Sequence, residues 1–142
     1  MPTKKRTSPA PQGLDTPLRI IPLGGVGEIG KNMYVFEYGD DIVVIDCGLM
    51  FPDEEMYGID LIIPDITYLK QNAAKVRAFL ITHAHEDHIG ALAPLWPQLE
   101  KKVYCRRFTA TIGRLKFEEA GLPVDQIVVV EPRPATVEVG PF

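Results

Sequence analysis

The chain has 142 residues, of which 46% are apolar and 24% are charged, and its formal net charge is −4 at pH 7. This composition is ordinary for a globular chain, and the length is that of one domain. The negative charge argues only weakly against nucleic-acid binding, because a basic groove can lie in another domain. No apolar run approaches the length of a membrane-spanning helix, and no apolar stretch follows the N-terminal basic residues. We therefore predict neither a membrane span nor a signal peptide.

Residues 1–17 are rich in proline, threonine and basic side chains. This composition cannot bury a core, so we predict a disordered basic, proline-rich tail. A first strand is predicted over residues 18–23. Two further strands are predicted over residues 32–38 and 42–45, and the turn residues between them indicate an antiparallel hairpin.

Gly25, Gly27 and Gly30 have the spacing of a dinucleotide-binding loop. That motif needs a crossover helix between the glycines and the next parallel strand. Only 15 residues lie between Gly30 and Asp46, and they are predicted to form the hairpin. Nucleotide binding is therefore not expected. The glycines are predicted to form a flexible loop that lets the backbone approach a substrate or a metal site.

Asp46 ends an apolar strand, where an unpaired carboxylate is costly to bury. One interpretation is that Asp46 accepts a hydrogen bond from the free ring nitrogen of a metal-bound histidine. The alternative is that it caps its own turn. Next are predicted a long irregular loop over residues 50–63, a short helix over 66–72 with Asp65 as a cap, and a buried strand over 76–82.

All three histidines of the chain and one carboxylate follow that strand, as His83, His85, Asp87 and His88. Imidazole and carboxylate groups are ligands of Zn²⁺ and similar ions. Residues two apart in an extended segment point to the same side, so His83 and His85 can share one ion. Asp87 and His88 are better placed for a second ion. The alternative is a polar helix start in which the histidines occur by chance.

The remaining pattern predicts a helix over residues 89–99 interrupted by two prolines, a strand over 103–105, and an amphipathic helix over 109–120. Two further strands are predicted over 127–130 and 136–139. Cys47 and Cys105 are interpreted as reduced residues in or near the core. Four basic residues near the second helix are predicted either to face phosphate or to be solvated; they are Arg106, Arg107, Arg114 and Lys116.

The order of strand, Asp-x-Gly turn, loop, strand, His-x-His-x-Asp-His and helix resembles the front half of the metallo-β-lactamase fold. Four segments also resemble the bacterial ribonuclease J family, of the β-CASP branch. They are GGVGEIGKNM (24–33), IDCGLMFP (45–52), residues 58–69, and HAHEDHIGAL (83–92). The resemblance implies an α+β fold, namely the front half of an αββα sandwich, with a mixed and antiparallel sheet and flanking helices.

The resemblance implies that His83 and His85 bind one zinc ion, that Asp87 and His88 bind the other, and that Asp46 is a supporting acid. Asp87 would then lie at the reaction centre. Mn²⁺ or Mg²⁺ is a possible substitute for zinc. The implied activity is metal-dependent hydrolysis of RNA, as a 5′-to-3′ exonuclease and endonuclease in mRNA decay and rRNA processing. The family further implies a cytoplasmic protein and, for the full-length form, a dimer or tetramer.

No histidine follows His88, so this chain offers each ion only two protein ligands, fewer than a catalytic zinc normally has. We therefore interpret residues 18–142 as the N-terminal part of a metallo-β-lactamase domain, truncated before the β-CASP and C-terminal domains, and predict that it is inactive alone. Two alternatives remain. One is another hydrolase of this fold that acts on a small ester or thioester. The other is a non-catalytic interaction module.

Overall fold

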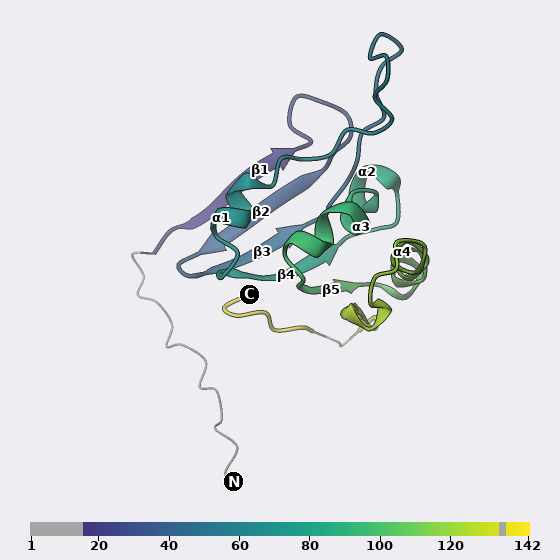
Figure 1. The fold of residues 1–142 in the computed structure, drawn as a ribbon. Coiled ribbons are helices and arrows are strands. Elements are labelled where there is room, and N and C mark those ends of the chain that lie inside the picture. The colour runs from purple at the N-terminus through teal and green to yellow at the C-terminus, as the bar shows by residue number, and fades with distance from the viewer. Residues whose placement is uncertain (1–15, 134–135) are drawn as a thin grey trace, which may run out of the picture.

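A computed structural model describes residues 16–133 and 136–142. The predicted tail lies almost wholly outside the described residues. A single sheet of six strands runs through the molecule, and each strand lies beside its sequence neighbours (Figure 1). The strands are β1 (Leu18–Gly24), β2 (Met33–Tyr38), β3 (Asp41–Ile45), β4 (Val76–Ile81), β5 (Lys102–Cys105) and β6 (Ile127–Val129).

The sheet is mixed, as the sequence predicted. Strands β1, β2 and β3 are antiparallel, and β3, β4, β5 and β6 are parallel. The hairpin of β2 and β3 is confirmed, with Val35 opposite Val44 and Gly39 at positive φ in the turn. An antiparallel pair at this place is incompatible with a dinucleotide-binding unit, whose first two strands are parallel. The α+β class is therefore confirmed.

The helices lie on one face of the sheet (Figure 1). They are α1 (Thr67–Gln71), α2 (Glu86–Ile89), α3 (Leu92–Leu95) and α4 (Arg107–Glu119), with 3₁₀ turns η1 (Trp96–Gln98) and η2 (Val124–Gln126). The main core fills the space between helices and sheet, and its largest members include Phe79 from β4 and Phe117 from α4. The rings of Trp96 and Phe117 pack with their centroids 5.3 Å apart. Burial of these large apolar groups is the main stabilising contribution.

Two helix predictions need correction. The helix predicted over 89–99 starts earlier, at Glu86, and is divided into α2, α3 and η1. The negative charges of Glu86 and Asp87 in the first turn interact favourably with the positive end of the helix dipole, and this favours the earlier start. Helix α4 likewise starts two residues before the predicted position. Helix α1 starts at Thr67, and Asp65 accepts hydrogen bonds from the Thr67 backbone N–H and hydroxyl, which lower the pKa of Asp65.

The strand predicted over residues 136–139 is absent from the structure. Val139 and Phe142 exchange backbone hydrogen bonds in a tight turn, in which Gly140 has a φ of +60°. The side chain of Val139 packs with Val43 and Ala78, which face away from the helix-side core because their strand neighbours Val44 and Phe79 belong to it. The alternating valines are therefore explained by packing onto the sheet, and not by pairing at its edge.

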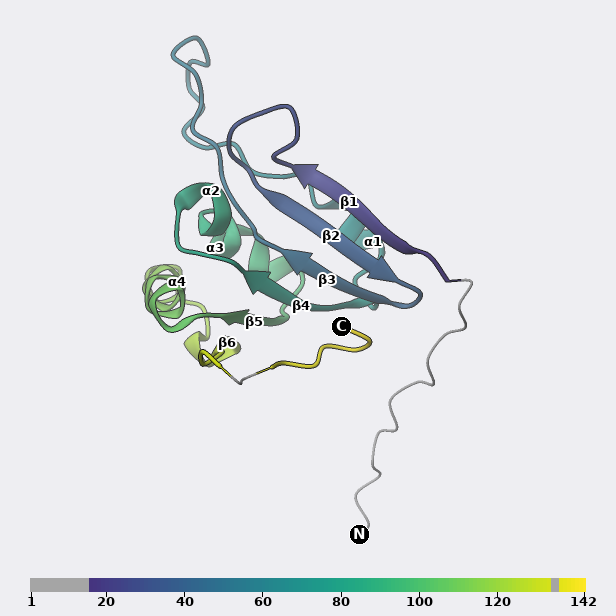
Figure 2. The same ribbon diagram turned by 180° about the vertical axis from the view of Figure 1, so that it is seen from behind.

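The long loop before α1 is confirmed as irregular, apart from an isolated bridge between Met50 and Ile62. It projects away from the sheet (Figures 1 and 2). Several apolar side chains on it are exposed, among them Tyr57, at 92%. In the part of the chain that the structure describes, no helix is long and apolar enough to cross a membrane.

Candidate metal centre

The residues singled out from the sequence meet at the carboxyl ends of two neighbouring parallel strands. Asp46 directly follows β3, and residues 82–88 follow β4. His85 is the extended residue that precedes α2, so His83 and His85 lie in the turn whereas Asp87 and His88 lie on the helix. Carboxyl ends of parallel strands are where α/β sheets commonly place their functional groups.

The three imidazole rings form one cluster. The ring centroids of His83 and His88 are 4.0 Å apart, and those of His83 and His85 are 4.6 Å apart. His85 is exposed, and the other two rings are half-buried. The structure therefore brings together all the histidines that the sequence placed within six residues, with one ring open to solvent.

Asp46 is the buried acid of the cluster, with 4% of its surface exposed. Its Oδ2 lies 2.7 Å from Nδ1 of His88. Its Oδ1 accepts a hydrogen bond from the backbone N–H of Thr82 at 2.7 Å, and the Thr82 hydroxyl donates to the same carboxylate. These partners compensate for the burial of the carboxylate. Thr82 and His88 lie 36 and 42 residues after Asp46 in the sequence. The Asp46 side chain therefore does not act only as a cap for its own turn.

The contact with Asp46 also determines which nitrogen of His88 is free. Because Nδ1 faces the carboxylate, Nε2 is the nitrogen available to other groups, and it lies 3.3 Å from Oδ2 of Asp87. A carboxylate that holds one ring nitrogen orients the imidazole and makes the other nitrogen a better ligand. Asp46, His88 and Asp87 thus form a continuous chain of polar contacts.

Helix α2 is held on several sides through its own carbonyl groups. The backbone N–H groups of Leu49 and Cys47 donate to the carbonyls of Glu86 and His88 at 3.0 and 2.8 Å, and that of Asn32 donates to Asp87 at 2.9 Å. A helix of four residues has little stability of its own, so these contacts fix the direction of Asp87 and His88. Sequence reasoning did not identify Asn32 as part of the site.

Helix α4 is tied to the site by an ion pair that sequence reasoning also missed. Nζ of Lys116 lies 2.6 Å from Oε1 of Glu86. The other three basic residues of this region also have partners within the chain: Arg106 donates to the carbonyls of Val130 and Glu131, Arg107 pairs with Glu131, and Arg114 donates to the carbonyl of Ile127. Arg106 and Arg107 are exposed as well as paired, which agrees in part with the expectation of solvated side chains, whereas Arg114 and Lys116 are partly buried. All four connect α4 to its neighbours.

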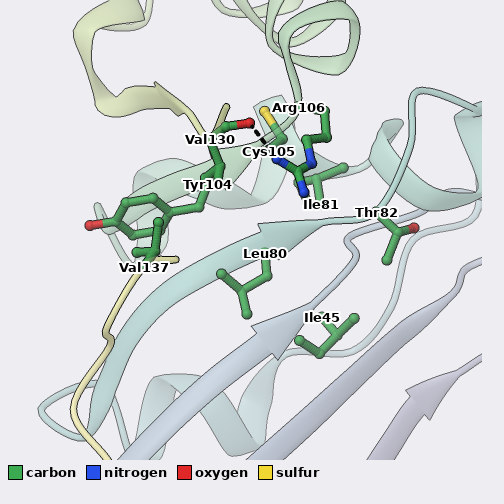
Figure 3. Close-up of a pocket in the computed structure, with 9 residues that line it drawn as sticks. All are labelled: Ile45, Leu80, Ile81, Thr82, Tyr104, Cys105, Arg106, Val130 and Val137. Atoms are coloured by element: carbon green, nitrogen blue, oxygen red, sulfur yellow. Dashed lines mark hydrogen bonds between the residues drawn. The ribbon is translucent and has the colours of Figure 1, made fainter. Parts of the chain in front are cut away.

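A cavity of about 400 Å³ lies beside the site, on the sheet face away from the helices (Figure 3). The side chains of Ile45, Leu80, Tyr104 and Val137 contribute to its walls. Thr82 also lines it, next to the histidine cluster, and on the other side Arg106 donates to the Val130 carbonyl (Figure 3). The site therefore opens beside an apolar surface.

Both cysteines are free and buried, as predicted. Burial, assisted by the negative charge of Asp46, raises the pKa of the Cys47 thiol far above its usual range. Burial also raises the pKa of Cys105, to about 11, against an opposing effect of Arg114. Thiols with raised pKa values are protonated at neutral pH and are poor nucleophiles and poor metal ligands.

The donor atoms fit a divalent ion in kind. The cluster offers imidazole nitrogens and a carboxylate, which are suitable for Zn²⁺, and a buried acid that orients one imidazole. The number of donors is smaller than such an ion requires. Within residues 16–133 and 136–142, no three His, Cys, Asp or Glu side chains are grouped so that they could hold one ion together.

The fold and the cluster define a class of protein. The family model for the metallo-beta-lactamase superfamily matches residues 26–141, so the chain belongs to that superfamily. Solved structures show a similar fold. Human tRNase Z, short form, has a TM-score of 0.50 and 15% identity over 81% of this chain and 46% of its own. A B3 metallo-beta-lactamase has a TM-score of 0.51 and 21% identity over 89% of this chain and 50% of its own.

Within the superfamily, the chain is similar to ribonuclease J proteins. It is 46% identical to "Ribonuclease J" of Synechocystis sp. over 106 residues. These residues make up 74% of this chain and 17% of that protein. It is 50% identical over 95 residues to "Ribonuclease J 2" of Staphylococcus aureus, which covers 67% of this chain and 17% of the relative. The predicted resemblance is confirmed, and the chain spans about one sixth of the length of these relatives.

Proposed function

We propose that this chain carries part of the active site of a metal-dependent ribonuclease that hydrolyses RNA phosphodiester bonds. The observation that carries the proposal is the chain of contacts from Asp46 through His88 to Asp87, at the end of the parallel strands. Its support is the identity of 46–50% to ribonuclease J proteins over the same region. The relatives' substrate is inferred for this chain from that similarity.

In this proposal, His83 and His85 hold one divalent ion and Asp87 and His88 hold a second. When bound, such ions supply Lewis-acid chemistry, in which they lower the pKa of water and neutralise charge on phosphate oxygens. The residues of the chain orient this centre. Asp46 keeps Nδ1 of His88 occupied and directs Nε2 toward Asp87, and the Thr82 hydroxyl lies 2.9 Å from Nδ1 of His83.

The finer features of the proposed activity are those that the resemblance to the ribonuclease J family implies. They are zinc as the ion, with Mn²⁺ or Mg²⁺ as a substitute, both 5′-to-3′ exonuclease and endonuclease action, and a role in mRNA decay and rRNA processing. A cytoplasmic location and a dimeric or tetrameric full-length protein belong to the same proposal. We propose that residues 1–142 alone are inactive, because no three ligating side chains of the described residues share one ion.

The test compares hydrolysis of 5′-labelled single-stranded RNA by the full-length protein and by its His85→Ala and Asp87→Asn variants. Loss of a metal ligand is expected to lower the rate by at least about 100-fold, since several kcal/mol of transition-state stabilisation come from the ions. His85 is exposed, so its replacement leaves the core intact. Turnover of a thioester without cleavage of RNA would instead favour a hydrolase of small substrates.

A further inference from the structure

The glycine-rich segment of residues 24–30 leads directly to Asn32, which lies against the candidate centre. The backbone N–H of Asn32 donates to the carbonyl of Asp87 at 2.9 Å, and its carbonyl accepts from the N–H of Gly48 at 3.0 Å. Asn32 is thereby fixed between the two segments that carry the site, the turn after β3 and helix α2. Its backbone cannot shift without disturbing both.

The side chain of Asn32 is directed at the same residues. Nδ2 donates to Oδ2 of Asp87 at 3.1 Å and to the carbonyl of Asp87, also at 3.1 Å. It lies 3.4 Å from Nε2 of His88. One amide thus contacts both side chains that are proposed to hold the second ion. A carboxylate that accepts a hydrogen bond in this way loses rotamer freedom, which makes it a more pre-organised ligand.

The glycines explain how this amide is held. A Cβ at Gly25 would lie 2.4 Å from Oδ1 of Asn32, and the φ of Gly25 is +85°. At Gly30, where φ is +108°, a Cβ would lie 2.9 Å from the side chain of Met50. Only glycine is compatible with both the backbone conformation and the close approach. The segment therefore packs against the oxygen side of the Asn32 amide, opposite the nitrogen that faces Asp87.

We propose that Asn32 is a positioning residue for Asp87 and His88, and that the glycine-rich segment serves to hold its amide in place. The inference rests on the proposed function, because it concerns the ligands of the second ion. It gives Gly25, the first glycine of the Gly-x-Gly-x-x-Gly pattern, a purpose other than nucleotide binding. Asn32 itself is not a catalytic residue here, since it acts through the two side chains that it contacts.

The test measures metal binding by the full-length protein, with competition for zinc by a chromophoric chelator and with the visible spectrum of bound Co²⁺. Asn32→Leu removes the donor at similar volume. The matched control is Asn72→Leu, which removes an asparagine amide that donates to the Tyr68 carbonyl at 2.9 Å. Asn72 precedes β4, whereas the site follows the other end of that strand. Asn32→Asp keeps the shape but replaces the donor by an acceptor opposite Asp87, and it serves if Asn32→Leu does not fold.

Asn32→Leu is expected to weaken binding of one of two zinc ions by about 10-fold or more, as is typical when a partner of a metal ligand is lost. Asn72→Leu should leave both affinities within about twofold of wild type. Asn32→Asp should bring two carboxylates together, so zinc should raise its unfolding temperature more than that of wild type. Unchanged zinc affinities and an unchanged Co²⁺ spectrum in a folded Asn32 variant would overturn the inference alone. A wild-type full-length protein that binds no metal would contradict the proposed function as well.

Discussion

Oδ2 of Asp46 lies 2.7 Å from Nδ1 of His88, although 42 residues separate the two in sequence. The contact joins the turn after β3 to helix α2, and Asp46 has a positive φ of 63° at this point. A non-glycine residue in that region of backbone space is strained, and such strain is typical of functional sites. The same contact determines which nitrogen of His88 is free to bind an ion.

Replacing Asp46 tests this contact directly. Asp46→Asn keeps the size of the side chain but removes the negative charge that orients His88. We expect zinc affinity to fall by about 10- to 100-fold, the usual effect of losing a carboxylate partner of a ligating histidine. Isothermal titration of the full-length protein with zinc measures the change. Asp60→Asn, at an exposed position of the long loop, is the control and should bind zinc as wild type does.

Gly48 is a second position at which the site depends on close packing. A Cβ there would lie 1.6 Å from the carbonyl oxygen of Asp87, which is impossible without moving α2. Gly48→Ala should therefore destabilise the protein by about 3 kcal/mol or more, at the upper end of overpacking effects. Gly58→Ala is the control, since its φ is +78° but nothing lies within 4 Å. It should cost about 1–2 kcal/mol, the cost of the left-handed conformation. Urea unfolding of the two variants gives both values, and equal losses would contradict this account.

The ion pair between Lys116 and Glu86 should contribute little to stability. Solvent screens this pair, because 23% of the Lys116 side chain and 43% of the Glu86 side chain are exposed. We expect a coupling free energy below about 1 kcal/mol, as is usual for such pairs. A double-mutant cycle with Lys116→Met and Glu86→Gln, followed by urea denaturation, measures it. A coupling of several kcal/mol would show that the pair is a main anchor of α2.

The buried thiols predict a stability that depends on alkaline pH. Burial raises the pKa of Cys105 to about 11 in the folded protein, whereas an unfolded thiol has a pKa near about 8.5. The folded state therefore holds its thiol proton more tightly. Its stabilising effect is complete below the unfolded pKa and is lost as the pH rises toward the folded one. Thermal unfolding temperatures should fall between about pH 8.5 and 11, and more steeply than in a Cys105→Ala variant.

Much of the fold was predictable from local patterns, because those patterns act over short distances. The hairpin follows from turn residues between two apolar runs, and the position of the histidine cluster after β4 follows from the buried strand that precedes it. The earlier start of α2 was also foreseeable, since Glu86 and Asp87 favour a helix N-terminus.

The remainder depends on contacts between distant segments, which no local pattern specifies. The alternating residues Val137 and Val139 predict a strand, but the segment packs on the sheet face and makes a turn at Gly140. The role of Asn32 depends on residues 55 and 56 positions later, and only the folded chain brings them together. Lys116 pairs with Glu86 for the same reason. These three features can be identified only from the tertiary structure.

The most direct test of the central claim is hydrolysis of labelled single-stranded RNA by the full-length protein after removal and return of metal. We predict that chelation abolishes cleavage, that zinc or manganese restores it in the wild-type protein, and that restoration fails in the His88→Ala variant, which lacks the ring that Asp46 orients. Cleavage that continues unchanged without metal, or that the His88→Ala variant retains in full, would contradict the claim.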